Sequence, residues 1–160
     1  MIKELEAKRA EQLAAEYFGN GYHCAEAVAA AVLETMGEES SSAIAYCSAF
    51  GGGLGESFTE TCGVVSGSLI VIGHFYARKG RGESWQDAAQ LGGDVVRQFA
   101  ALYGTCNCGE LRERFGEENQ MNLCRKLVRQ GAETLIASLS EKWKEESGKN
   151  FSDAECTSCS

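Results

Sequence analysis

The sequence predicts an all-α fold, a single-domain helical bundle of about five to seven helices, on three observations. The chain of 160 residues contains no proline, so nothing breaks a helix from within, and its 19 glycines are available to end helices. Long segments are rich in alanine, leucine, glutamate, lysine, arginine and glutamine, which favour helices. Hydrophobic residues make up 44% of the chain, enough for one core of this size.

Two helices separated by glycines are predicted in the first part of the chain. The first begins near Ile2 and ends at the Gly19–Gly21 turn. Four side chains at helical spacing are expected on its buried face, namely Ile2, Leu5, Leu13 and Tyr17. The second runs from about Tyr22 to Met36, and its many alanines permit close packing against neighbouring helices.

The middle of the chain is predicted to contain a short helix, a glycine loop and a central helix. The short helix covers Ala43 to Phe50, with Ser40–Ser42 as candidate N-caps. The glycine-rich segment Gly51–Gly55 must be a loop, which we expect to turn Cys62 toward other helices. The next helix covers Glu60 to Arg78 and is apolar on nearly every side, which places it at the centre of the bundle.

Three further helices are predicted after Ser84, which is positioned to cap the first of them. That helix runs from Trp85 to about Tyr103. Its expected buried face consists of Ala88, Leu91, Val95, Phe99 and Leu102. A short helix follows Cys108, and a long one runs from about Met121 to Glu146. The long helix has leucines at helical spacing at Leu123, Leu127, Leu135 and Leu139.

These boundaries divide the chain into a helical cysteine-cluster domain, residues 1–146, and a flexible tail, residues 147–160. The tail lacks a hydrophobic repeat and carries Cys156 and Cys159 at the spacing of a redox dithiol.

Composition and charge limit the setting in which the protein acts. The N-terminal segment is charged where a signal peptide would be apolar, and the longest apolar run, Gly63–Gly73, is too short to span a membrane. We therefore expect a cytoplasmic protein without membrane insertion. The net charge of −8 argues against nucleic-acid binding. A homodimer is compatible with such a bundle, and the sequence does not identify a redox partner protein.

Four of the eight cysteines fall at or just before the first turn of a predicted helix: Cys24, Cys62, Cys108 and Cys124. The amides and dipole of a helix N-terminus stabilise negative charge, so we expect these thiols to have lowered pKa values. Four thiolates on four helix ends could converge on one point of a bundle. Such a pocket suits an iron–sulfur cluster, for which cysteines are the usual ligands, and indicates electron transfer or redox sensing.

Two other chemistries fit the same residues. A thiol–disulfide oxidoreductase would use Cys62 as the attacking, catalytic thiol and one of the other three to resolve, with no cofactor. It could pass electrons to the pair Cys156 and Cys159. A structural zinc-binding interaction module would use the four cysteines as metal ligands, with Cys106 as a further candidate.

Two remaining residues have simpler expected roles. Cys47 lies within a predicted apolar helix face and is expected to be an ordinary core residue. His23 precedes Cys24, where it could tune the thiol, although histidines in such positions are more often surface or satisfied core residues.

The segments around these cysteines form an ordered pattern along the chain: His23–Val28, Phe50–Gly55 with Thr61–Gly67, Cys108–Leu111 and Leu123–Val128. This pattern resembles the C-GCAxxG-C-C family of redox-active proteins and extends from about residue 10 to residue 140. The resemblance implies redox activity and selects the same four cysteines. The chain departs from it at Val64, where the family's Cys-Gly-Ala-x-x-Gly form has alanine. We expect the added methyl groups to crowd the facing helix.

Overall fold

The computed structural model describes residues 2–155, with side chains described for residues 4–148. Within this part of the chain it contains helices and no strand. The helices are α1 (Ile2–Gly19), α2 (Cys24–Thr35), α3 (Ser41–Cys47), α4 (Gly63–Tyr76), α5 (Gln86–Tyr103), α6 (Cys108–Phe115) and α7 (Gln120–Glu155). The predicted all-α class is confirmed. None of these helices is both long and apolar enough to cross a membrane.

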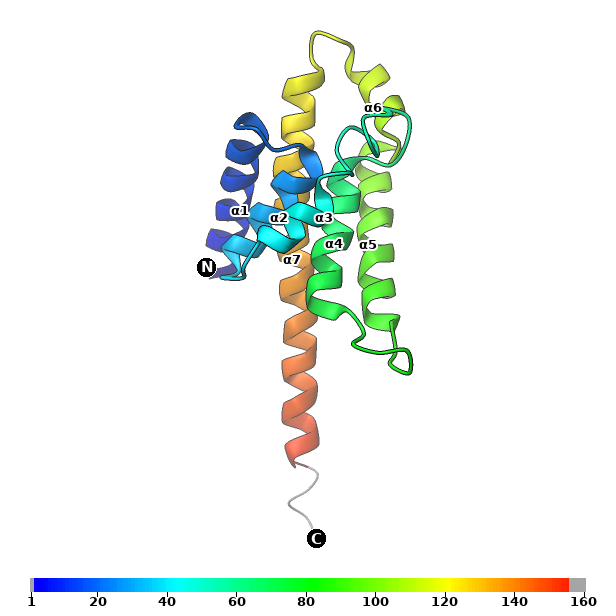
Figure 1. Cartoon of the computed structure of the whole chain (residues 1–160). Helices are drawn as coiled ribbons and strands as arrows, with labels where there is room; N and C mark the ends of the chain where they lie inside the picture. The colour runs from blue at the N-terminus through cyan, green and yellow to red at the C-terminus, as the bar shows by residue number, and fades with distance from the viewer. Residues whose placement is uncertain (1, 156–160) are drawn as a thin grey trace.

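α7 is the longest helix, and the others are arranged along it. α1 lies on one side of α7, and α4 and α5 lie on the other (Figure 1). α6 lies near the N-terminal end of α7, whereas the C-terminal part of α7 extends beyond the rest of the bundle (Figure 1). The helix continues past the predicted boundary at Glu146 to Glu155. Cys156 and Cys159 lie outside the described residues.

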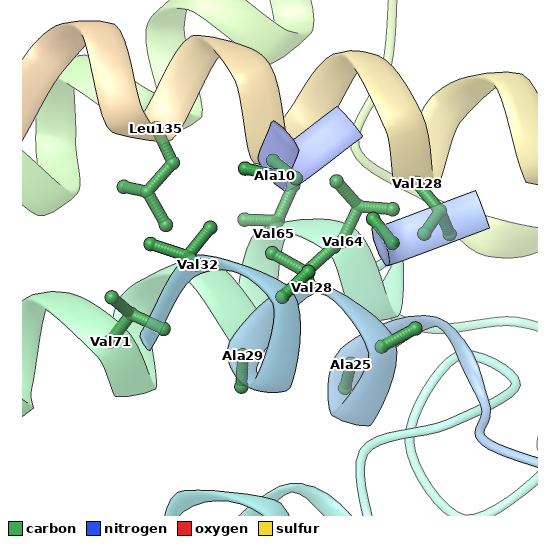
Figure 2. Packing of buried hydrophobic residues seen from close by; sticks show 14 of the residues in the cluster. Ala10, Ala25, Val28, Ala29, Val32, Val64, Val65, Val71, Val128 and Leu135 are labelled. Atoms are coloured by element: carbon green, nitrogen blue, oxygen red, sulfur yellow. The ribbon is translucent and has the colours of Figure 1, made fainter. Parts of the chain in front are cut away.

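The core is built around α2 and uses mostly small side chains. Nine consecutive residues from Ala25 to Leu33 are buried, so α2 has protein on every side. Figure 2 shows side chains of α2, α4 and α7 meeting there, with Val28 close to Val64 and Val32 close to Leu135. α4 also contacts α2, α5 and α7, so the predicted central position of this helix is confirmed.

Two predicted core residues are instead exposed to solvent. Leu5 is 65% exposed, because it lies on the opposite side of α1 from the fully buried Ala10 and Ala14. Leu102 is 66% exposed near the C-terminal end of α5, where Phe99 supplies the buried contact.

Val64 does not crowd the helix that faces it, contrary to the expectation from its extra methyl groups. The helix opposite Val64 is α7, and it carries Gly131 at the point of contact. A Cβ atom on Gly131 would overlap Cγ1 of Val64, so the missing side chain provides the space for the valine. Val64 is only 2% exposed in this position.

The start of α4 also differs from the prediction. The helix begins at Gly63 with Cys62 as its N-cap, three residues after the predicted start at Glu60. Thr61 is not part of the helix, because it forms an isolated antiparallel bridge with Asn107. This backbone pairing brings two cysteine segments together.

Candidate functional site: a cavity lined by four cysteines

One cavity of about 360 Å³ is lined by all four of the cysteines that the sequence singles out. Cys62 is the N-cap of α4, and Cys24 and Cys108 are the first residues of α2 and α6. These three thiols lie at helix N-termini, as predicted. Cys124 differs, because α7 begins at Gln120 and Cys124 is its fifth residue, just beyond the first turn.

Two glycines of α4 bring Cys62 next to Cys24. A Cβ atom on Gly63 would overlap the sulfur of Cys24, so the start of α4 rests directly on that thiol. One turn later, a Cβ atom on Gly67 would lie 2.5 Å from the carbonyl oxygen of Ala25. Only glycine permits this approach of the two helices at both positions. The spacing of the glycines after Cys62 therefore sets the crossing of α4 over α2.

Paired backbone segments hold Cys62 beside Cys108. The amide of Cys62 donates to the carbonyl oxygen of Cys106, and the amide of Cys108 donates to that of Glu60, both at 2.7 Å. These bonds flank the bridge between Thr61 and Asn107. Two cysteines from distant parts of the sequence are thus fixed through their own main chains, with little dependence on side-chain conformation.

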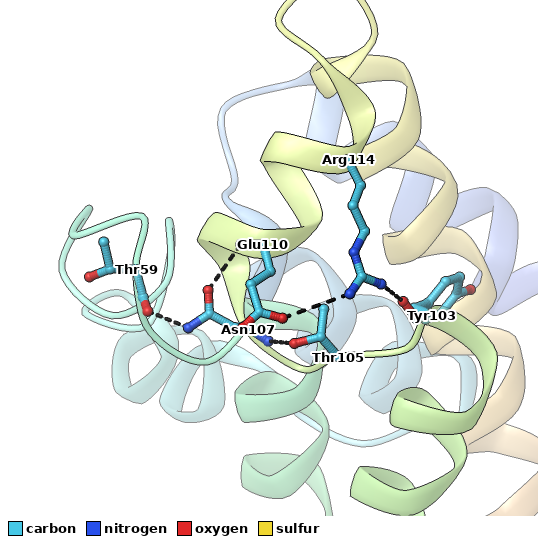
Figure 3. Close-up of polar contacts among 6 residues, drawn as sticks. All are labelled: Thr59, Tyr103, Thr105, Asn107, Glu110 and Arg114. Atoms are coloured by element: carbon cyan, nitrogen blue, oxygen red, sulfur yellow. Dashed lines mark hydrogen bonds and ion pairs between the residues drawn. The ribbon is translucent and has the colours of Figure 1, made fainter.

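Asn107 joins this pairing to the start of α6 (Figure 3). Its Nδ2 donates to the carbonyl oxygen of Thr59, and its Oδ1 accepts from the amide of Glu110 at 3.0 Å. The second bond is a helix N-cap, which satisfies an amide that has no partner within the helix. In the same view Arg114 donates to the carbonyl oxygen of Tyr103 at 2.8 Å, which ties α6 to the end of α5.

The glycine loop before Cys62 covers one side of the cavity. Every residue from Gly52 to Glu56 has a φ angle between +57° and +68°, and Phe58 has a φ angle of +54°. Leu54, Glu56 and Phe58 adopt this left-handed conformation without being glycine, at a cost of about 1–2 kcal/mol each. A Cβ atom on Gly53 would lie 2.7 Å from Cβ of Cys108, so the loop lies against that cysteine.

The order of these segments along the chain matches that of a known protein family. The family model described as "Putative redox-active protein (C_GCAxxG_C_C)" matches residues 22–158, which include all four cavity cysteines and the glycines of α4. The chain belongs to this family. A redox role follows from that membership. Comparison with curated proteins and with solved structures finds no match.

Burial controls the acidity of the thiols in this C_GCAxxG_C_C protein, so the expectation of lowered pKa values is wrong for three of them. Cys62 is only 6% exposed, and burial followed by the charge of Cys24 raises the pKa of its thiol. Burial likewise raises the pKa of Cys124, to about 11, and that of Cys108. The cost of placing a thiolate in this apolar cavity exceeds the stabilisation from the helix ends.

The cavity is also lined by residues that the cysteine pattern does not identify. Phe18, Tyr22, Phe58 and Met121 provide apolar surface. Arg112 lines the cavity as well, with its guanidinium carbon 4.1 Å from the centre of the Phe58 ring. Its charge opposes the rise in pKa at both Cys108 and Cys124. The sequence contained one indication that Arg112 belongs to the site: it lies four positions after Cys108 and therefore shares a helix face with that cysteine.

The remaining described cysteines lie outside the lining of the cavity. Cys47 is 0% exposed in the core, as predicted, and burial followed by the charge of Glu26 raises its pKa to about 12. The thiol of Cys106 donates to the carbonyl oxygen of Val96 on α5 at 3.7 Å. Cys106 therefore faces a different part of the bundle from its neighbour Cys108.

His23 lines the cavity beside Cys24, and its backbone amide donates to Oε2 of Glu26 at 2.9 Å. Within the described side chains, no three His, Cys, Asp or Glu groups are arranged to hold one metal ion.

Proposed function

We propose that Cys24, Cys62, Cys108 and Cys124 hold an iron–sulfur cluster, through which the protein transfers single electrons or senses redox state. The observation that carries this proposal is the convergence of four thiols, from four different helices, on one cavity. Cysteine thiolates are the usual protein ligands of such clusters, commonly four at a time. A cavity of about 360 Å³ with sulfur donors around it fits a group larger than a single ion.

The chain's own residues would support this function in two ways. The buried setting of Cys62 and the apolar walls formed by Val64 and Leu127 limit the access of water, and water exposure is one of the properties that set the potential of a cluster. Burial also keeps the thiols of Cys62 and Cys124 protonated at neutral pH, so ligation by these two residues must release protons. A bound cluster supplies a reversible one-electron couple.

Two observations favour this proposal over thiol–disulfide exchange and structural zinc. An attacking thiol must be ionised and accessible, whereas Cys62 is 6% exposed and has a raised pKa. A structural zinc ion needs four ligands about 2.0–2.3 Å from one point. Among the described side chains, no three His, Cys, Asp or Glu groups are arranged to hold one ion, and the four cysteines share the lining of their cavity with aromatic side chains and Arg112.

Protein produced and reconstituted without oxygen tests the proposal through its iron and acid-labile sulfide content. We expect a coloured protein that contains both. Cys62→Ser should lose most of the iron, because it removes the most buried donor. Cys106→Ser is the matched control, since its hydroxyl can also donate to the carbonyl oxygen of Val96, and it should retain full iron content.

Three outcomes would reject the cluster. A colourless, metal-free protein after reconstitution would exclude it, and zinc without sulfide would support the zinc-binding module. Reversible loss of two hydrogen atoms per cysteine pair in a metal-free protein, detected by mass spectrometry across a redox titration, would support the oxidoreductase. Full iron content in Cys62→Ser would show that the ligand set is wrong.

A further inference from the structure

The mouth of the cysteine cavity combines exposed apolar side chains with one partly buried cation. Tyr22, Phe58 and Met121 line the cavity and are also exposed, and Met121 reaches 65% exposure. Arg112 is the one arginine or lysine among the described residues that line it. Its guanidinium forms no ion pair with any described side chain.

The structure fixes the position of this charge. Arg112 lies one helical turn after Cys108 on α6, so the two side chains share a face. The ring of Phe58 lies 4.1 Å from the guanidinium carbon, at a distance typical of a cation–π contact. Phe58 itself sits on the left-handed loop with a φ angle of +54°. A strained aromatic residue thus holds the cation at the opening.

One carboxylate, Glu56, also lines the cavity. Glu56 is exposed, whereas Arg112 is half-buried, so solvent screens the carboxylate more strongly. The charge of Arg112 acts on the thiols of Cys108 and Cys124, and Glu56 is not among the groups that shift the pKa of either. Among the arginine, lysine, aspartate and glutamate side chains of the described lining, Arg112 is therefore the one whose charge acts on these two sulfurs, where it opposes the effect of a negative charge on Cys24.

We infer that Arg112, held by Phe58, makes the cavity mouth a selective entrance for negatively charged small molecules, and specifically for anionic low-molecular-weight disulfides that react at Cys108 or Cys124. A fixed charge at a low-dielectric opening raises the local concentration of ions of opposite sign. The planar guanidinium suits a carboxylate group, and the rim of Tyr22 and Met121 offers apolar surface to the rest of the molecule. This selectivity goes beyond the proposed function and concerns the metal-free cavity.

The reaction at the thiols is a balanced exchange. A cysteine thiol loses its proton to solvent, and the thiolate attacks one sulfur of the disulfide. The sulfur–sulfur bond of the small molecule breaks, and its second half leaves as a thiolate with the bonding electron pair. The cysteine and the attacked sulfur form a mixed disulfide. The small disulfide is the oxidant, so no further reactant is required.

Three disulfides of different charge test the inference on reduced, metal-free protein: dianionic dithiobis(nitrobenzoate), neutral dithiodipyridine and dicationic cystamine. The rates of mixed-disulfide formation at Cys108 and Cys124 are followed by peptide mass spectrometry. We expect the wild-type protein to have a higher ratio of anion rate to cation rate than glutathione shows with the same reagents. Arg112→Gln should reduce the anion-to-cation rate ratio by about tenfold, and Arg112→Lys should restore most of it.

Lys126→Gln is the matched control, because it changes the net charge equally. Lys126 is two residues from Cys124 but lines a separate groove with Arg125 and Arg129, and its loss should change the ratio less than twofold. An unchanged ratio in Arg112→Gln, or an equal fall with all three reagents, would overturn the inference.

Salt provides a second measurement that needs no variant. Raising the ionic strength should reduce the anion preference of the wild-type protein, because it screens the charge of Arg112. A wild-type protein without any anion preference at low salt would also overturn the inference, even if Arg112→Gln failed to fold. Iron and sulfide content is measured separately, so failure of this selectivity and failure of the cluster proposal are distinguishable.

Discussion

At the scale of single residues, Gly63 determines whether Cys24 and Cys62 can face the same cavity. Gly63→Ala should place a Cβ atom on the sulfur of Cys24 and force α4 away from α2. We expect a loss of about 1–3 kcal/mol in the free energy of unfolding, which is typical of overpacking. Urea denaturation measures this loss, and iron content after reconstitution should fall with it.

Gly73→Ala on the same helix is the control for that substitution. A Cβ atom on Gly73 would meet nothing within 4 Å, so only helix propensity changes. We expect unchanged stability or a gain of up to about 1 kcal/mol. Equal effects of the two alanines would show that Gly63 has no special role in the contact between the helices.

The four cavity cysteines were accessible to sequence reasoning, but their acidity was not. Helix starts can be located from the glycines and caps around Cys24, Cys62 and Cys108, and this identified the site. Burial depends on segments far away in the sequence, such as the loop that covers Cys108. The sign of the pKa shift follows from burial, so reasoning from helix ends alone gave the wrong direction.

At the scale of helices, Val64 and Gly131 form a compensating pair between α4 and α7. Gly131→Ala alone should destabilise the protein by about 1–3 kcal/mol, because its Cβ atom overlaps the valine. Val64→Ala alone should cost about 2 kcal/mol through lost buried methyl groups. The double variant should be at least about 1 kcal/mol more stable than the sum of the two changes predicts.

Thermal or urea denaturation of the four proteins completes this double-mutant cycle. Additive changes would contradict direct contact between the two positions. The same comparison should explain the departure from alanine at position 64: the valine is accommodated where the facing helix carries glycine.

Asn107 is the residue on which the junction between α6 and the Cys62 segment depends. Asn107→Ala removes both the cap on Glu110 and the bond to Thr59, and should cost about 1–2 kcal/mol. Asn107→Asp retains the cap but removes the donor to Thr59. We expect it to preserve most of the stability while increasing hydrogen exchange at the amide of Cys108.

Hydrogen exchange measured by mass spectrometry or NMR separates these two roles. Identical exchange rates in wild-type protein and Asn107→Asp would indicate that the bond to Thr59 does not hold the bridge.

Helix positions were predictable from the sequence, but the faces they bury were only partly so. Glycines and polar caps marked the ends of most helices within a few residues. Leu5 is exposed because it lies on the side of α1 opposite Ala10 and Ala14, and these small residues rather than the leucine form the buried face. The contact between Arg112 and Phe58 was missed because Arg112 lies on a helix and Phe58 lies on a left-handed loop, and the sequence does not show how the loop is oriented.

At the scale of the whole molecule, the buried thiols predict a loss of stability at alkaline pH. An unfolded thiol loses its proton near pH 8.5, whereas burial raises the pKa of Cys124 to about 11 and that of Cys47 to about 12. The unfolded chain therefore binds fewer protons in this interval. The contribution of these two thiols to stability should be constant below about pH 8.5 and should fall as the pH rises toward 12.

Urea midpoints of the reduced, metal-free protein between pH 7 and pH 11 measure this dependence. Cys47→Ala removes one fully buried thiol outside the cavity, so it should lower the stability at pH 7 but weaken the dependence on pH. A dependence as steep as that of the wild-type protein would mean that the thiol of Cys47 does not contribute to it.

The length of α7 determines how the tail cysteines could communicate with the cavity. Glu155 lies 31 residues after Cys124, which corresponds to about 46 Å along the helix. Cys159 is four residues further on, and even a fully extended chain reaches only about 14 Å. With α7 intact, thiol exchange between the tail pair and the cavity must occur between two molecules. Its rate should therefore be second order in protein concentration, and tenfold dilution should lengthen its half-time tenfold.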